Sequence, residues 1–185
     1  TLESGIYENT QVTEITHELA DVTIYYTTDT SIPDNTSIEF SGAISILANQ
    51  NIRAIAYKNG YAPSQIENAA YLIDEASNIS TVYITTEYQN FFDDEIGIYV
   101  DGTNGIQAFC APYPVNWAQD WERPVNIKMF LPDGSQVFNV NAGAKISGVC
   151  SRNNAMKSLA ISLREKEYGN GELGYRLFDN RDHDN

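Results

Sequence analysis

The chain has 185 residues, a formal net charge of −14 and 42% hydrophobic residues, a composition that excludes a disordered chain. Arg53 and Lys58 are the only basic residues among the first eighty, so that half is excluded from binding nucleic acid or an anionic membrane by electrostatics. No run of about 18 apolar residues occurs, which predicts no membrane insertion.

Residues 1–75 are predicted to form short strands separated by turns, because runs rich in Thr, Tyr, Ile and Val favour strands. Alternation places Ile52, Ala54 and Ala56 on one strand face. Such spacing is typical of an immunoglobulin-like β-sandwich. The predicted strands cover residues 22–28, 43–47, 51–57 and 67–73, and the polar residues 74–80 read as a linker.

Residues 80–185 are predicted to form a second β-rich domain with minor α-structure, so the fold class is mainly β. A tight hairpin turn is expected at 131–135, where Pro132 precedes Asp133 and Gly134. Helical turns are allowed only near 88–93 or 116–122. The predicted strands cover residues 81–85, 96–100, 124–130, 136–140, 144–147 and 158–163.

The segment 142–168 concentrates basic residues in an otherwise acidic chain, which indicates either a solvated face or an anion site. Strand alternation puts Lys157 on the same face as Leu159, Ile161 and Leu163. An inward lysine could bind phosphate, or its stem could lie over the rim of the core. Arg152 and Ser151 could add donors to the same anion or stabilise their own loop.

Several other side chains allow two interpretations each. Trp117, Trp121 and Tyr113 could stack on sugar rings, although large aromatics usually anchor a core. The acidic run at 93–95 is read as a solvated turn rather than an acid/base or Ca²⁺ site. The two cysteines, at positions 110 and 150, either form a disulfide in an exported protein or remain as buried thiols.

The first part of the chain resembles the chitobiase/β-hexosaminidase C-terminal type of module. The resemblance rests on GIY at 5–7, IYYTTDTSIP at 24–33, NIRAIAYKNGYAPS at 51–64 and AAYLI at 69–73. Where the family usually has Gly after the turn aspartate, Thr30 follows Asp29 here. The resemblance implies an immunoglobulin-like accessory module of a secreted or surface protein, without catalysis.

The second part resembles the N-terminal region of the CotH (spore coat protein H) kinase-like family. The matching stretches are FFDDEIGIYVDG at 91–102, NWAQDWERPVNIKMFLPDG at 116–134, and AGAKISGVCSR with MKSLAISLREKEYG within 142–169. The resemblance implies a kinase-like fold that uses ATP and Mg²⁺ in a full-length protein. The family's metal-binding acids lie downstream of the Lys-Ser motif, so residues 80–185 are expected to be an incomplete kinase-like domain with no cofactor of their own.

These observations lead to one main expectation and two alternatives. The chain is expected to be a non-catalytic accessory or structural region of a secreted or cell-surface multidomain protein. Its partner would be a protein or glycan at the cell surface, with self-association through exposed sandwich edges as a further expectation. The alternatives are the leading part of an ATP-dependent CotH-like protein kinase, with Lys157, Arg152 and Ser151 on phosphate, and cell-wall or polysaccharide binding.

Overall fold

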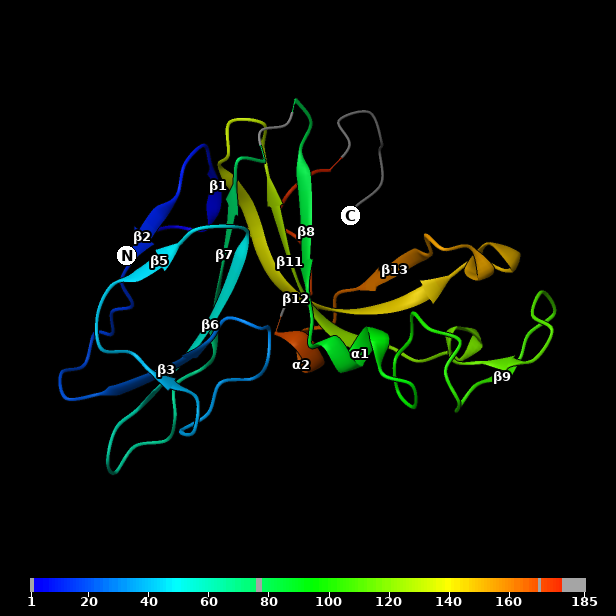
Figure 1. Ribbon diagram of the computed structural model, residues 1–185, viewed down its shortest axis with the longest axis horizontal. Coiled ribbons are helices and arrows are strands. Elements are labelled where there is room, and N and C mark those ends of the chain that lie inside the picture. Colours follow the sequence, from blue (N-terminus) through cyan, green and yellow to red (C-terminus); the bar gives the residue numbers. More distant parts are fainter. Residues whose placement is uncertain (1, 76–77, 170, 178–185) are drawn as a thin grey trace. The chain divides into compact units, whose positions relative to one another are not determined.

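The computed structural model describes residues 2–75, 78–169 and 171–177, and its elements are labelled in Figure 1. Strands dominate and the helices are short, so the predicted mainly β fold class is confirmed. Two compact units are present: Thr1–Val82 with Met129–Val137, and Tyr83–Lys128 with Phe138–Asn185. Within the described ranges, no helix is long and apolar enough to cross a membrane.

The first unit contains a five-stranded sheet and a two-stranded sheet. In the larger sheet, β1 pairs with β7 in parallel and the other pairs are antiparallel. The order of its strands is β1 (Gly5–Tyr7), β7 (Glu67–Ile73), β6 (Gln50–Tyr57), β3 (Thr23–Thr27) and β4 (Ile38–Glu39). The smaller sheet pairs β2 (Gln11–Thr13) with β5 (Ile44–Ile46).

The core of this unit forms because alternate residues of the strands point to one side. On β6, Ile52, Ala54 and Ala56 are all buried, as the alternation of the sequence predicts. Ile46 of β5 and Tyr71 of β7 are the most deeply buried large side chains of the cluster. The Tyr71 hydroxyl donates to the Leu2 carbonyl at 3.1 Å, so the polar end of this buried ring is satisfied.

The turn after β3 contains a non-glycine residue in a left-handed conformation. Thr30 has a φ of 70°, a region that a β-branched residue rarely adopts. It occupies the position where the chitobiase-type pattern has Gly. The contacts that hold the turn include two hydrogen bonds: the Asp29 carboxylate accepts from the Ser31 N–H at 3.1 Å, and the Arg53 guanidinium donates to the Thr30 carbonyl at 2.8 Å.

A four-stranded sheet in the order β13-β12-β11-β8 and a short β10-β9 hairpin account for the remaining strands. Helices are short, and two of them fall where the sequence allows helical turns, α1 (Tyr88–Phe92) and the 3₁₀ helix η1 (Asn116–Ala118). The other elements are β8 (Thr81–Thr85), β9 (Ile106–Gln107), β10 (Pro114–Val115), β11 (Arg123–Phe130), β12 (Gln136–Ser147), η2 (Cys150–Asn153), β13 (Ser158–Ser162) and α2 (Glu165–Tyr168).

The hairpin turn at 131–135 has the predicted tight geometry. The Leu131 N–H donates to the Ser135 carbonyl at 2.9 Å, and Gly134 adopts a φ of 83°. The two strands predicted at 136–140 and 144–147 are instead one continuous strand, β12. The small residues Ala142 and Ala144 are fully buried inside it, so this stretch continues the sheet rather than interrupting it.

The predicted strand at 96–100 is wrong, because this segment folds back on α1 as a loop. The N–H groups of Gly97, Ile98 and Tyr99 donate to carbonyls of residues 90–93 at 2.8–3.1 Å. A Cβ at Gly97 would lie 2.4 Å from the Asp93 carbonyl oxygen, so only glycine permits this close approach. Ile98 is buried in the core that the loop covers, which explains the apolar character of the segment.

Candidate functional site

The candidate site lies in the second unit, where two loops are covalently joined. A disulfide links Cys110, in the loop after β9, to Cys150 at the start of η2, with 5.2 Å between their Cα atoms. Of the two alternatives left open by the sequence, the structure therefore has the disulfide. The Asn153 side chain also donates to the Cys110 carbonyl at 3.2 Å, which adds a second link between the same loops.

Asp101 organises the polar contacts around the tryptophan of η1. One of its carboxylate oxygens accepts from the Trp117 indole N–H at 2.7 Å, and the other accepts from the Tyr113 hydroxyl at 3.0 Å. This carboxylate raises the pKa of Tyr113 above its ordinary value, because it accepts the proton that the phenol would lose. Trp117 is only 1% exposed, so it anchors the core and its ring faces cannot stack on a sugar.

Lys157 lies immediately before β13, beside two aromatic rings. Its ammonium nitrogen is 5.6 Å from the centre of the Tyr99 ring and 5.3 Å from that of Trp117, within the range of cation–π attraction. It donates to the carbonyls of Arg152 and Asn154 at 2.7 and 3.0 Å. Partial burial lowers the pKa of Lys157, and the nearby Asp101 carboxylate opposes that effect.

The structure brings the three predicted phosphate-binding residues into one loop region. Arg152 donates through Nε to the Gly148 carbonyl at 2.6 Å and through Nη1 to the Ala118 carbonyl at 3.4 Å. Ser151 lies so close to Gly148 that a Cβ there would be 2.2 Å from the Ser151 hydroxyl. Both cations thus donate to backbone carbonyls, and their role in binding an anion stays a prediction.

The expected inward face of β13 is only partly formed. Leu159 and Leu163 pack against the buried core cluster, but Ile161 is 43% exposed. Ile161 still shares a face with Leu159 as predicted, because the two pair with Ala144 and Ile146, which are both buried, on β12. β13 is the last strand of its sheet, so it has a neighbour on one side only.

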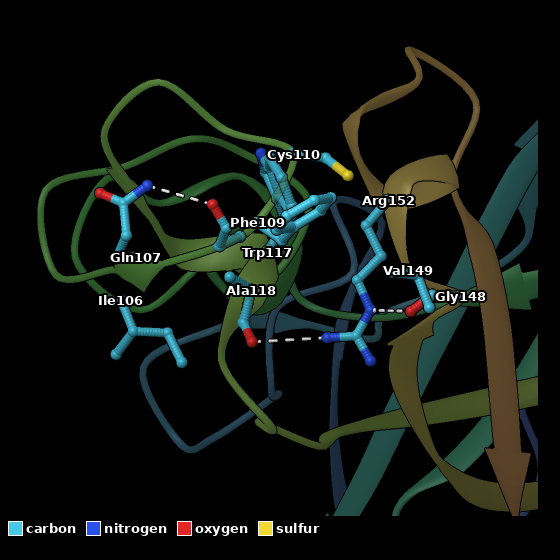
Figure 2. A pocket seen from close by; sticks show the side chains of 10 residues that line it. Ile106, Gln107, Phe109, Cys110, Trp117, Ala118, Gly148, Val149 and Arg152 are labelled. Carbon is cyan, nitrogen blue, oxygen red and sulfur yellow. Dashed lines mark hydrogen bonds between the residues drawn. The ribbon is translucent and has the colours of Figure 1, made fainter.

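A pocket of about 180 Å³ opens beside the disulfide (Figure 2). Figure 2 shows the guanidinium group of Arg152 at one side, with its hydrogen bonds to the Gly148 and Ala118 carbonyls. The pocket is lined mainly by apolar groups, and Arg152 is the one charged residue among the described residues that line it. The lining residues are Ile106, Gln107, Ala108, Phe109, Cys110, Trp117, Ala118, Gly148, Val149 and Arg152.

Charged groups elsewhere in the second unit also make polar contacts. Lys145 pairs with Asp120 at 2.9 Å, and this hydrogen bond lowers the pKa of the Asp120 carboxyl below its ordinary value. In the acidic run at 93–95, Asp93 accepts from the N–H groups of Glu95 and Ile96 at 2.9 and 3.0 Å, which agrees with the predicted turn. Among the residues that the structure describes, no three His, Cys, Asp or Glu side chains form a metal-binding group.

The fold and the sequence comparisons together define the class of the first unit. Its sheets make it a β-rich, sandwich-like module, and residues 13–71 match the family described as Fn3 associated. The match supports a fibronectin- or immunoglobulin-like accessory module of a multidomain protein, compatible with the chitobiase-type resemblance. No curated protein and no solved structure matches the chain. The family match does not extend to the CotH-like region, so that resemblance stays a prediction.

Sequence reasoning missed the residues that shape this site. Tyr99 and Asp101 stand within or next to a stretch that the sequence predicts as a strand. Nothing in the local pattern indicates that Asp101 accepts a hydrogen bond from Trp117, 16 positions away. Nor does it indicate that the Tyr99 hydroxyl accepts from the N–H of Lys157, 58 positions away. The sequence analysis also did not single out Phe109. Its position directly before a cysteine could have indicated it, because a disulfide restricts the conformation of the loop that carries this ring.

Proposed function

We propose that this chain is a non-catalytic accessory region of a secreted or cell-surface multidomain protein, in which the first unit serves as a spacer or interaction module. The observation that carries the proposal is the disulfide between Cys110 and Cys150, because disulfides persist in oxidising compartments outside the cytosol. The match of residues 13–71 to the Fn3 associated family supports an accessory role. The partner would be a protein or glycan at the cell surface.

The test is the thiol state and location of the protein in its natural host. Cells and medium are separated under acid quenching, and free thiols are labelled with a maleimide polymer before and after reduction. The proposal expects the protein in the extracellular or surface fraction, with label added only after reduction. A protein found inside the cell with two labelled thiols would overturn it.

The kinase alternative is tested through Lys157. An ammonium group has three N–H donors, and two of those of Lys157 are directed at loop carbonyls. This geometry favours a structural role for Lys157 over a phosphate contact. Calorimetric titration with ATP and Mg²⁺ is therefore expected to give no heat of binding for the chain. Saturable binding that Lys157→Ala abolishes, and that Lys166→Ala leaves intact, would instead support the leading part of a CotH-like kinase.

The glycan alternative rests on exposed aromatics. Tyr113 is 52% exposed, whereas Trp117 is buried, so Tyr113 is the better candidate for stacking on a sugar. Co-sedimentation with insoluble cell-wall polysaccharide is expected to leave the chain in the supernatant. Retention that is lost in Tyr113→Ala and kept in Tyr61→Ala, a control in the first unit that is 65% exposed, would favour glycan binding over a purely structural role.

A further inference from the structure

The pocket beside the disulfide combines apolar walls with one cationic group. Apolar side chains of Ile106, Phe109 and Val149 line it, and the guanidinium group of Arg152 lies at one side (Figure 2). Phe109 and Val149 are 98% and 75% exposed, so both present apolar surface to solvent. Such walls favour a ligand that brings apolar surface of its own.

The size of the pocket limits that ligand to a single ring. Pockets for whole drug-sized ligands usually measure about 300–1,000 Å³. This one measures about 180 Å³. An apolar cavity of about 150 Å³ accommodates one benzene ring. One aromatic ring therefore fits the pocket, and a larger ring system does not.

The Arg152 guanidinium is held by two backbone carbonyls and keeps one of its amino groups free. Nε donates to the Gly148 carbonyl at 2.6 Å, and Nη1 donates to the Ala118 carbonyl at 3.4 Å. Among the residues that the structure describes, none accepts a hydrogen bond from Nη2. Because the side chain is already held, a ligand that binds to Nη2 costs little side-chain entropy. A carboxylate is the acceptor that suits such a donor best.

The charges around Arg152 favour a ligand with a single negative charge. The neighbouring Lys157 directs two of its donors at the carbonyls of Arg152 and Asn154. The Asp120 carboxylate interacts electrostatically with Arg152, although its hydrogen bond is with Lys145. A phosphate group carries up to about two negative charges at neutral pH and has three acceptor oxygens. One guanidinium group with one free amino group matches a monocarboxylate better than a phosphate.

We propose that this pocket binds an aromatic carboxylate of one ring, with the ring against the apolar wall and the carboxylate on Nη2 of Arg152. Two sources supply this chemistry: a free aromatic acid, and the C-terminal aromatic residue of a peptide. The site belongs to the second unit, and its occupancy does not depend on the accessory role proposed above.

The test is a nitrogen–proton NMR titration of the full chain with sodium benzoate. A ligand of this size is expected to bind with a dissociation constant of about 1 mM, and to shift the amide signals of the pocket loops selectively. Benzamide has the same shape without the charge, so it should bind at least about tenfold more weakly. Acetate keeps the charge and lacks the ring, and it should also bind at least about tenfold more weakly.

A second titration separates the two sources. N-Acetylphenylalanine presents its ring and carboxylate as a peptide C-terminus does. Tighter binding of N-acetylphenylalanine than of benzoate assigns the site to a chain end, and the reverse order assigns it to a free aromatic acid.

Matched variants locate the contact. Arg152→Met should weaken benzoate binding about tenfold or more, whereas Lys166→Met, which removes the same charge from α2, should leave it unchanged. Ala118→Leu fills the pocket and keeps both backbone carbonyls that hold Arg152, so it should abolish binding without removing the cation. Asp120→Asn removes the competing carboxylate and should tighten binding about two- to fivefold.

Three results would overturn the proposal. The first is no saturable shift with benzoate up to about 10 mM, ten times the expected dissociation constant. The second is equal affinity for benzoate in Arg152→Met and the parent chain. The third is tighter binding of inorganic phosphate than of benzoate at the same amides. None of these results depends on where the protein is located, so the accessory role is tested separately.

Discussion

Both units bury an apolar cluster, but they hold the segments around it by different means. In the first, paired strands bury an apolar cluster around Ile46 and Tyr71. In the second, long loops cover the sheet, and directional contacts hold them: the disulfide, the Asp101 carboxylate on Trp117, and the fully buried Asn116. The Asn116 side chain donates to the Asp94 carbonyl at 2.9 Å and accepts from the Asn104 N–H at 3.0 Å. Strand pairing satisfies backbone groups by itself, whereas loops need side chains for this purpose.

The largest expected effect comes from removing the disulfide. Replacing both cysteines by serine frees a loop of 40 residues, which the chain-entropy relation converts to about 4 kcal/mol of lost stability. Both tryptophans lie in the second unit, so urea unfolding followed by tryptophan fluorescence reports on that unit. Its midpoint should fall sharply, while amide exchange of β6 in the first unit stays protected. Equal losses in both units would contradict the distinction drawn between them.

The next effect tests the apolar core of the first unit. Ile46→Ala removes a side chain with no exposed surface and should cost about 3 kcal/mol in unfolding free energy. The adjacent Leu47 is 71% exposed, so Leu47→Ala should change stability by less than about 0.5 kcal/mol. Far-ultraviolet circular dichroism during urea unfolding measures both variants. Similar losses for the two neighbours would show that burial does not set the stability of this unit.

A smaller effect, of opposite sign, is expected at the turn after β3. Thr30 has a φ of 70°, so Thr30→Gly relieves backbone strain and should stabilise the first unit by about 1 kcal/mol. The nearby Thr28 has no such conformation, and Thr28→Gly should destabilise by about 0.5–1 kcal/mol through lost backbone entropy. Thermal unfolding of both variants checks the signs. Destabilisation by both would mean that the strain at Thr30 is not relieved by glycine.

The smallest effect concerns pH and the second unit. The hydrogen bond from Lys145 lowers the pKa of Asp120 in the folded chain. A carboxyl whose pKa is lowered on folding stabilises the fold above its unfolded pKa, and that contribution is lost as pH falls through the lowered value. Carbon NMR titration should find the pKa of Asp120 below its ordinary value, and Lys145→Met should return it upward. An unchanged pKa in Lys145→Met would exclude the ion pair as the cause.

Local patterns predicted β3, β5, β6 and β7 of the first unit and missed the short strands β1, β2 and β4. Alternation identified the buried face of β6, because a strand's side chains must point to opposite sides of its sheet. The same reasoning failed at 96–100, where apolar residues fill the core from a loop fixed by the α1 carbonyls. It also divided β12 at residues 141–143, although Ala142 lies fully buried inside one continuous strand.

The candidate site was predicted only in part, because local patterns do not show which distant residues come into contact. The sequence indicated that Lys157, Arg152 and Ser151 belong together, because they are near neighbours along the chain. The structure adds Asp101, Tyr99 and Trp117, which are distant from these residues in the sequence. Local sequence patterns do not predict contacts between residues so far apart.

The sequence by itself determined the mainly β class, the positions of most strands and the segregation of acidic and basic residues. These follow from short-range rules of side-chain alternation, turn chemistry and charge. Only the tertiary structure decided that Cys110 pairs with Cys150, that the buried Trp117 donates to Asp101, and that the exposed Phe109 lines a pocket beside the disulfide. Those features depend on which distant segments pack together, and packing is a property of the whole fold.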